Sequence, residues 1–490
     1  MEGKCRSNGV FDPQRWGLPV EEVDSLADRF RLSWERFRGC FRTRTRDPSH
    51  NAFTYLRGLL TMERNRNYAN IARRVNGLED DGQRLQHFMS DSPWSAKPVF
   101  DQIQKEIGGY PELHGGMLTL DESGDKKAGE KSAGVARQYL GRLGKVDLGQ
   151  VGVTLGYYQS GEWMMVDAEL YLPEVWFSPE FAGLRLGLHI PSDRTFRTKL
   201  ELGLEMILRA RANGLPFQVV GCDSHYGRDS RFRAQLNAEG ILYMAEVPSN
   251  IHIYLRKPDI GVPEKLPGCR GCPPSRKKVL DGVRPIEVRE LARSGSLNWR
   301  KVKVRPSERG DLTYECAALR VWTVSNEGEA REEWLFLHRE GDGSVRYFLS
   351  NAPEDTELGT LALWRSLRYF AERIYQDSKS EIGWDELIAR KYRAWMHHAA
   401  LTALALWFIV ETKLDWARRY GKDSDLARQL EVEVLPHLSV ANVRELLRAA
   451  MPLEQLSREE AVRLVIKHLF HRSRSTRSRL KAQSKNGGAI

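Results

Sequence analysis

The sequence predicts a fold of mixed α/β and α+β class, in which helical regions flank a core of strands and helices. Three observations support this prediction. Residues 1–110 place apolar side chains three and four positions apart, residues 117–247 alternate short apolar strands with helices, and residues 249–352 give mostly short strands. The helical pattern returns after residue 353. At 490 residues, the chain is long enough for roughly two to four domains.

The composition is that of a globular protein with a basic bias. Hydrophobic residues make up 41% of the chain, charged residues make up 29%, and the net charge is +10. A positive balance favours a polyanionic partner such as nucleic acid. Residues 461–490 contain eight lysines or arginines and no acidic residue. We expect residues 474–490 to form a flexible basic tail, either solvated and inert or adding salt-dependent affinity for DNA.

Other features disfavour secreted and membrane proteins. The six cysteines show no disulfide framework, which suits a reducing cytoplasm. The polar start of the chain predicts no signal peptide, and the longest apolar run, residues 399–410, is too short to span a bilayer. We therefore expect a cytoplasmic protein without a membrane partner. Cys269 and Cys272 form a single CxxC pair without two further evident ligands, so two free thiols in a loop are expected rather than a zinc site.

The first 110 residues are predicted to be helical and basic. Residues 67–75 and 82–89, with a turn at Asn76-Gly77 between them, have the pattern of a DNA-reading helix–turn–helix unit. Arg73 and Arg74 are its candidate DNA contacts. An ordinary helical bundle with a solvated basic face explains the N-terminal sequence equally well, because short helix–turn–helix patterns are weakly specific. One face of an earlier helix is apolar and is formed by Val23, Leu26, Phe30, Trp34 and Phe37.

The elements of residues 117–247 follow a specific order. A first strand ends at Asp121, and residues 150–159 and 162–173 predict a hairpin. A helix ended by Gly214, a fourth strand with Asp223 at its carboxyl end, another helix and a fifth strand follow. Three strands in a meander and then helix, strand, helix, strand is the order of a ribonuclease H-like core. The first and fourth strands are neighbours in that order, so Asp121 and Asp223 should lie together.

Residues 249–352 are predicted to be a mostly β insertion between the fifth strand and a helix over residues 364–379. Arg368, Glu372 and Lys379 share one face of this helix, because they lie four and seven residues apart. A carboxylate between two cations suits metal and phosphate binding better than a purely apolar core. We divide the chain into six regions. These are a helical DNA-binding or dimerisation region (1–110), the first part of the core (111–248), the β-rich insertion (249–352), the second part of the core (353–412), C-terminal helices (413–473) and the basic tail (474–490).

Asp121, Asp223 and Glu372 are the candidate catalytic and metal-binding residues. Two aspartates at the ends of adjacent strands, facing a helical glutamate, can hold two divalent cations about 3.5–4 Å apart. Mg²⁺ suits hard oxygen ligands and keeps sites open for water and phosphate, and Mn²⁺ could substitute. Each aspartate alone would more simply be a turn residue after a strand. Glu381 is the alternative to Glu372 but has no arginine four residues before it, and Glu122 and Asp125 could be confused with Asp121.

Basic residues near these carboxylates are candidate DNA contacts. Arg368 and Lys379 would bind phosphates or orient Glu372, whereas His225 would contact DNA or water near the metals or be merely structural. Four cations downstream of Asp121 would lie along the DNA backbone, namely Lys126, Lys127, Lys131 and Arg137.

Three segments, in order, resemble bacterial insertion-sequence transposases of the DDE superfamily. LDESGDKKAGEKSAGVARQYLGRLGKVDLGQVGV resembles their first-aspartate region, GCDSHYG their second, and RYFLSNAP followed by R-x3-E-x6-K their catalytic helix signature. The resemblance covers about residues 118–409 and, more loosely, the helical N-terminal region. One departure is Arg365, which stands where the signature has a tyrosine that contacts phosphate or base.

The resemblance implies metal-dependent cleavage at inverted terminal repeats of an element and joining of the ends to target DNA, usually by a cut-and-paste route. It also implies at least a homodimer when two double-stranded DNA ends are held together. Related transposases place an aromatic residue of the insertion against an unstacked base, although Trp299, Trp322 and Trp334 could equally be core residues. A domesticated DNA-binding relative and a nuclease that only cuts are the alternatives.

Overall fold

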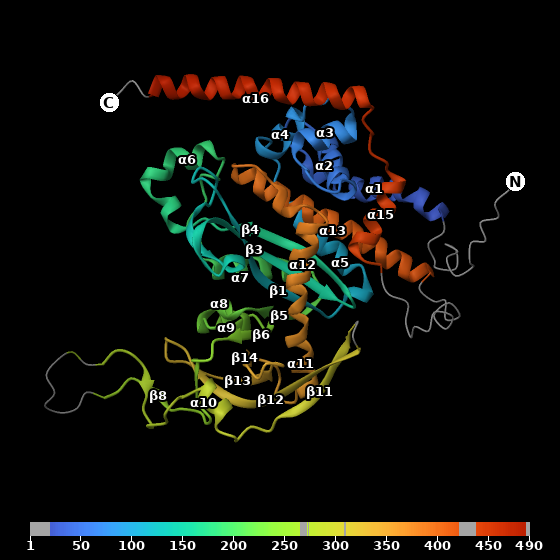
Figure 1. Ribbon diagram of the computed structural model, residues 1–490. Coiled ribbons are helices and arrows are strands. Elements are labelled where there is room, and N and C mark those ends of the chain that lie inside the picture. Colours follow the sequence, from blue (N-terminus) through green and yellow to red (C-terminus); the bar gives the residue numbers. More distant parts are fainter. Residues whose placement is uncertain (1–19, 265–271, 273, 308–309, 421–437, 487–490) are drawn as a thin grey trace.

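The computed structural model describes residues 20–264, 272, 274–307, 310–420 and 438–486 (Figure 1). The helices are α1 (Val20–Phe37), α2 (Ser49–Thr61), α3 (Tyr68–Asn76), α4 (Gln83–Ser90), α5 (Lys97–Gly108), α6 (Ala182–Gly187), α7 (Lys199–Ala212), α8 (Ser224–Gly227), α9 (Ser230–Ala238), α10 (Val288–Arg293), α11 (Leu358–Leu367), α12 (Tyr369–Ser380), α13 (Tyr392–Tyr420), α15 (Val440–Ala450) and α16 (Arg458–Asn486). The main strands are β1 (Gly116–Lys126), β2 (Ala136–Leu140), β3 (Lys145–Gln159), β4 (Glu162–Leu170), β5 (Phe217–Cys222), β6 (Leu242–Val247), β11 (Arg300–Ser307), β12 (Gly310–Val324), β13 (Ala330–Arg339) and β14 (Val345–Ser350). Short strand pairs join β7 (His252–Ile253) to β10 (Ile286–Glu287) and β8 (Ile260–Gly261) to β9 (Lys278–Val279).

The core sheet has the predicted ribonuclease H-like order. β3 pairs antiparallel with β4 and β1, whereas β1, β5 and β6 run parallel, giving the order β4-β3-β1-β5-β6. The β3–β4 hairpin turns at Ser160 and Gly161, which both have positive φ angles of 51° and 84°. Such turns match the twist of the two strands. Gly214, with φ 78°, follows α7 as predicted.

The β-rich segment extends this sheet instead of forming a separate one. β14 pairs antiparallel with β6, and β13, β12 and β11 follow outward. At the other end, β2 pairs with β3, although the sequence analysis predicted no strand there. Within the described residues, ten strands therefore form one continuous sheet.

The helix predicted over residues 364–379 is interrupted at Arg368. The backbone N–H of Arg368 bonds to the carbonyl of Ser366 and ends α11, and α12 begins at Tyr369. No proline or glycine marks the break, so no local pattern predicts it. α11 packs on β11, β12, β5 and β6, whereas α12 packs on β1, β3 and β4, so each half follows a different part of the sheet (Figure 1).

Two glycines of β3 let helices approach the sheet closely. A Cβ atom at Gly156 would clash with Ile374 of α12, and one at Gly152 would clash with Trp395 of α13. Residues 152 and 156 lie on the same face of the strand, so α12 and α13 cover the same face of the sheet. This close approach places α12 beside the middle of β1, where Thr119 pairs with Gly156 and Asp121 pairs with Thr154.

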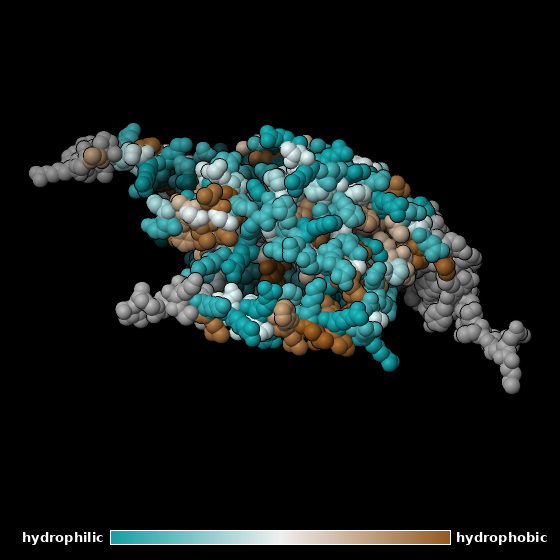
Figure 2. All heavy atoms as spheres, turned by 90° about the horizontal axis from the view of Figure 1, so that it is seen from above, coloured by the Kyte–Doolittle hydropathy of each residue, from teal (hydrophilic) through white to brown (hydrophobic). Residues whose placement is uncertain are grey.

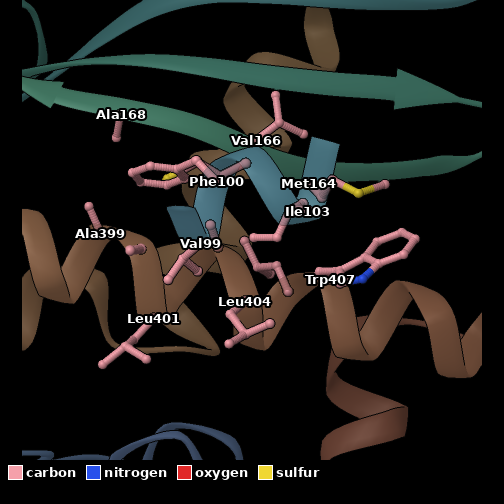
Figure 3. Packing of buried hydrophobic residues seen from close by; sticks show 14 of the residues in the cluster. Val99, Phe100, Ile103, Met164, Val166, Ala168, Ala399, Leu401, Leu404 and Trp407 are labelled. Carbon is pink, nitrogen blue, oxygen red and sulfur yellow. The ribbon is translucent and has the colours of Figure 1, made fainter. Parts of the chain in front are cut away.

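The N-terminal helices pack onto the core. The apolar face of α1 is buried as predicted, with Leu26, Phe30 and Phe37 at most 2% exposed. α3 and α4 form the predicted pair of short helices around a turn. α5 and α13 pack against β4, and side chains from all three interlock (Figure 3). Residues 399–410 of α13 are buried throughout, as predicted.

Leu404 of α13 lies at the centre of this packing and is 2% exposed (Figure 3). Leu404→Ala should lower the free energy of unfolding by about 2–5 kcal/mol, because it removes buried methyl groups and leaves a cavity. Urea denaturation followed by circular dichroism measures the loss. Leu186→Ala, at a site that is 80% exposed, is the control and should cost far less. Equal losses for the two variants would contradict the burial of Leu404 among α5, α13 and β4.

The basic segment predicted to be a flexible tail is helical as far as Asn486, where α16 ends. The prediction of a flexible tail was wrong here, because a stretch of arginine, lysine, serine and alanine without proline permits a helix despite its charge. Within the described part of the chain, no helix is both long and apolar enough to cross a bilayer. Of the CxxC pair, Cys272 is an exposed free thiol, and Cys269 lies outside the described residues.

Candidate active site

The parallel pairing of β1 and β5 brings the two predicted aspartates to the same end of the sheet. Leu120 pairs with Cys222, the last residue of β5, and Asp223 directly follows that strand. Asp121 is the next residue of β1, which does not end there as predicted but continues along β3 to Lys126. Asp223 also caps α8, because its Oδ1 accepts hydrogen bonds from the backbone N–H groups of His225 (3.0 Å) and Tyr226 (3.4 Å). The second oxygen of that carboxylate, Oδ2, has no part in this cap.

A cleft of about 740 Å³ opens at this end of the sheet. Five of the predicted residues line it together, namely Asp121, Asp223, His225, Glu372 and Lys379. Glu381 does not line it and is instead paired with Arg444, whose Nη1 lies 2.6 Å from its Oε2. The geometry therefore favours Glu372 over Glu381 as the third acidic residue of the cleft.

Neighbouring acids on β1 point to opposite faces of the sheet. Asp121 pairs with Thr154, on the face covered by α12, whereas Glu122 points toward α7. The Oε2 atom of Glu122 lies 2.5 Å from Lys199 Nζ, and its Oε1 accepts a hydrogen bond from Tyr226 (3.3 Å). Glu122 is thus engaged by its own partners. Lys199, which also lines the cleft, was missed by the sequence analysis because it lies far from the motifs.

Tyr375 is a second cleft residue that the sequence analysis missed. Its hydroxyl forms a short hydrogen bond with that of Thr154, which in turn donates to the backbone carbonyl of Asp121 (3.4 Å). Burial and the negative charge of Asp121 raise the pKa of Tyr375 well above its usual value, so the phenol stays protonated. Helical spacing could have revealed this residue, because it lies three positions after Glu372.

Arg368 lies behind the aspartates, not among the residues that line the cleft. Its Nη1 atom is 3.7 Å from Glu246 Oε2, and its side chain is 24% exposed. Burial lowers the pKa of Arg368, but the negative charges of Asp121, Glu246 and Asp223 outweigh it and raise the pKa overall. Arg365 is likewise drawn to other partners, because it donates to the Tyr314 hydroxyl (3.0 Å) and to Glu340 (2.6 Å).

The charge of Asp121 is costly in the absence of a cation. Burial raises its pKa to about 6, the positive charge of Arg368 opposes this shift, and the negative charge of Asp223 adds to it. A carboxyl whose pKa is raised by folding destabilises the folded state once it ionises. The site therefore favours either a proton or a cation at Asp121 near neutral pH.

A stability measurement tests this cost. In metal-free buffer, Asp121→Asn should raise the melting temperature at pH 7, because the wild type pays for an ionised, buried carboxylate. The gain should shrink as the pH falls through about 6 and vanish below about 4, where the carboxyl is protonated in both folded and unfolded chains. Asp125→Asn, in the same strand, is the control. A gain that is independent of pH would contradict the raised pKa.

The remaining candidate DNA contacts are spread over the surface. Lys126 Nζ is 2.9 Å from Asp147 Oδ2, and Lys127, beyond the end of β1, lines a small recess beside Trp384. Lys131 and Arg137 are exposed. Arg73 is only 9% exposed and donates to Asn70 (2.8 Å), whereas Arg74 lines a separate hollow between α2 and α15.

The three tryptophans of the insertion are all partly buried. Arg339 lies over Trp299, Lys257 over Trp322 and Arg320 over Trp334. Trp334 also donates to the carbonyl of Pro353 (2.9 Å) and packs against the apolar core beneath α11. None of the three lines the cleft.

The cleft has the oxygen ligands of a divalent metal site, but these ligands lie too far apart to bind one ion together. Asp121, Asp223 and Glu372 supply hard carboxylate oxygens, and the raised pKa of Asp121 marks a place where a cation would relieve charge. Among the residues that the structure describes, no three ligating side chains are gathered closely enough to hold a metal ion. Glu372 is exposed at the edge of the cleft, so it would have to approach the aspartates.

Comparison with known proteins agrees with this geometry. Residues 36–311 match the model of a family described as DDE superfamily endonuclease. The chain belongs to this family. The match includes Asp121 and Asp223 and ends before Glu372, and enzymes of this family generally use divalent metal ions. A relative, described as a probable transposase for insertion sequence element IS701 from Microchaete diplosiphon, is 26% identical over 353 residues, which cover 70% of this chain and 78% of the relative.

Proposed function

We propose that this endonuclease is a transposase that binds the terminal inverted repeats of its own element, cleaves at their ends and joins the 3′-hydroxyl ends to target DNA. The observation that carries the proposal is one cleft that brings together Asp121, Asp223 and Glu372 on a ribonuclease H-like sheet. The similarity to the relative described as a probable transposase supports it. DNA as substrate would place the protein in the bacterial cytoplasm, with the nucleoid.

Asp121, Asp223 and Glu372 would hold two Mg²⁺ ions, for which Mn²⁺ could substitute. Bound there, the ions would lower the pKa of an attacking water or 3′-hydroxyl and stabilise the leaving oxygen. Asp121 offers its carboxylate on the α12 face of β1, and Asp223 offers the oxygen that does not cap α8. Arg368 keeps Asp121 ionised from behind, because its positive charge lowers the pKa of that carboxyl.

DNA would approach the cleft along its basic rim. His225 and Lys379 line the cleft and would meet phosphates near the cleaved bond. Lys126 at the end of β1, Lys131 in the loop that follows and Arg137 of β2 are exposed and would bind the DNA backbone further from the cleft. Arg74 of α3, in its separate hollow, would bind DNA on the helical side. Phosphate contacts of this kind fix the position of the duplex and do not read its sequence.

The experiment that tests the proposal uses a labelled duplex carrying the inverted repeats that flank the gene, with Mg²⁺ and an unlabelled target plasmid. Cleaved ends that become joined to the plasmid would support a transposase. Cleavage without joined products would favour a nuclease that only cuts. Specific binding without cleavage would favour a domesticated DNA-binding relative.

The proposed synaptic complex needs at least two copies of the chain, and α16 offers a surface for self-association. Five apolar side chains share one face of this helix and are 56–60% exposed, namely Val462, Val465, Ile466, Leu469 and Phe470. In Figure 1, α16 crosses the top of the molecule, and the same side, seen from above in Figure 2, is largely hydrophilic with separate apolar patches. We expect a second copy of α16 to cover this face.

The charges of α16 favour an antiparallel pair. Glu459 and Glu460 lie in its first turn, whereas Arg472 and Arg474 follow the apolar face. If two copies cross antiparallel at Ile466, Glu460 comes opposite Arg472 of the partner subunit. Opposite charges at such flanking positions select partner and orientation.

Ile466→Glu combined with Leu469→Glu should shift the protein from dimer to monomer, because the pair places charges in the centre of this contact. Sedimentation equilibrium measures the change, which should be at least about tenfold in the dimer dissociation constant. Leu480→Glu, at an exposed position of α16 outside the apolar cluster, is the control. An unchanged dimer, or a wild type that stays monomeric with and without end DNA, would contradict this contact.

A further inference from the structure

Arg66, in the loop between α2 and α3, reaches the far end of the helix that carries Glu372. Its Nη2 donates to the backbone carbonyl of Glu381 (2.7 Å), the residue that follows α12. Its Nη1 donates to Glu386 Oε1 (2.5 Å), and its backbone N–H donates to Glu386 Oε2 (2.6 Å). The side chain of Arg66 is 1% exposed. A buried arginine thus binds the chain on both sides of the turn after α12.

Arg444 of α15 binds the same turn from a second direction. Its Nη1 donates to the Glu381 carboxylate (2.6 Å), and its Nε donates to the carbonyl of Leu60 (3.1 Å). Both Arg444 and Arg66 also donate to the carbonyl of Met62. The side chain of Arg444 is 3% exposed. The two guanidinium groups therefore connect α2, α15 and the end of α12 through one set of hydrogen bonds.

The turn after α12 is shaped to receive Arg66. Gly383 has φ 79°, and a Cβ atom there would lie 2.7 Å from Arg66 Nη1, so a larger residue would displace the guanidinium. The last carbonyls of a helix lack partners within the helix and carry partial negative charge. An arginine placed there satisfies such a carbonyl and stabilises the helix end. Arg66 is thus a C-terminal cap supplied by a distant part of the chain.

We propose that Arg66 and Arg444 are positioning residues that hold the C-terminal end of α12 and thereby place Glu372 and Lys379 in the cleft. The inference rests on the proposed function of this cleft. Arg66 is two residues before α3, the first helix of the candidate DNA-reading pair, so the same contact joins that pair to α12. If α3 and α4 bind the end of the transposon DNA, this connection would transmit the binding to the position of Glu372.

The two arginines depend on their carboxylate partners. Burial lowers the pKa of both, and that of Arg444 falls to about 10, with the charge of Arg66 contributing to the shift. Two buried cations side by side are unfavourable unless acids neutralise them. Glu381 and Glu386, each 24% exposed, supply that charge. Removing Glu381 leaves the buried charge of Arg444 without its acid and should lower stability, although Arg444 keeps its hydrogen bonds to the carbonyls of Leu60 and Met62. A melting curve of the variant therefore has to show a folded protein before the rates are compared.

The test compares Glu381→Ala with Asp415→Ala. Asp415 of α13 is a matched control, because it is 25% exposed and paired with an arginine of the N-terminal helices, Arg29, at 2.9 Å. Glu381→Ala should speed hydrogen exchange of the α12 amides by at least about tenfold, because it removes a charge-assisted hydrogen bond. The single-turnover rate of end cleavage should fall by about tenfold with DNA affinity unchanged. Glu381→Gln, which keeps an acceptor for Arg444, should restore much of the exchange protection of α12 and much of the cleavage rate.

Equal exchange of α12 in Glu381→Ala and Asp415→Ala would overturn the proposal, and so would faster exchange with an unchanged cleavage rate. A loss confined to DNA affinity would also overturn it, because a positioning residue acts on the chemical step. If the wild type itself fails to cleave, the proposed function fails on its own. The exchange measurement still decides whether Arg66 and Arg444 hold α12.

Discussion

Glu372→Gln should abolish cleavage of end DNA while leaving its binding intact. The substitution keeps the size of the side chain but removes a negative charge from the cleft that also contains Asp121 and Asp223. Without it, cations would be held by two aspartates alone. We expect the single-turnover rate to fall by at least about a thousandfold, which corresponds to roughly 4 kcal/mol of barrier. Cleavage of labelled ends and a gel-shift assay on the same preparation measure both quantities.

Glu381→Gln is the matched control, because it makes the same chemical change nine residues further on, outside the cleft. It should reduce cleavage only a few-fold, through the looser end of α12. The reverse result, with Glu381 essential and Glu372 dispensable, would overturn the assignment of the third acidic residue. Loss of binding in Glu372→Gln would instead mean that this residue contacts DNA or supports the fold.

Arg368→Gln should make Mg²⁺ binding and cleavage need a higher pH. Burial holds the pKa of Asp121 at about 6, and the positive charge of Arg368 keeps it from rising further. An opposite charge close to a carboxyl lowers its pKa by about one to three units, so the variant should raise the pKa of Asp121 by a similar amount. A proton then competes with Mg²⁺ at neutral pH. Cleavage at pH 7 should fall at least about tenfold and recover partly at higher pH.

Titration calorimetry with Mg²⁺ and cleavage rates between about pH 5 and pH 9 separate this effect from a lost phosphate contact. In the wild type, apparent Mg²⁺ affinity should fall as the pH drops through about 6, because the protonated form of Asp121 cannot bind a cation. Arg365→Gln, three residues earlier and bound to Tyr314, is the control. An equal loss at every pH, with weaker DNA binding, would show that Arg368 contacts phosphate.

The features that could be predicted from sequence are those set by local periodicity and by strand order. The meander followed by helix, strand, helix, strand is visible in the chain, and it alone brings Asp121 and Asp223 to one end of the sheet. Glu372 and Lys379 lie in the same cleft because helical spacing puts them on one face of α12. The hairpin at Ser160-Gly161 was predictable for the same local reason.

Other features depend on contacts between distant segments, which no local pattern reveals. The break at Arg368 follows from two halves of a helix packing on different parts of the sheet, with an arginine drawn toward Asp121 and Glu246. The pairing of β14 with β6 depends on strands separated by about a hundred residues. Lys199 and Arg66 act at sites far from their own sequence neighbours, so neither belongs to a motif.

The pairing of β14 with β6 has a mechanical consequence. A module joined to a core by two loops can swing, but here the backbone hydrogen bonds of neighbouring strands run without interruption from β11 to β2. The sheet should therefore bend and twist as one unit, and a displacement of the outer strands would be transmitted to the end of β5. Deleting residues 249–352 would leave β6 as an exposed edge strand with unpaired backbone groups, which could pair with the same strand of another molecule. The segment thus protects the core sheet from edge-to-edge aggregation with other copies of the chain.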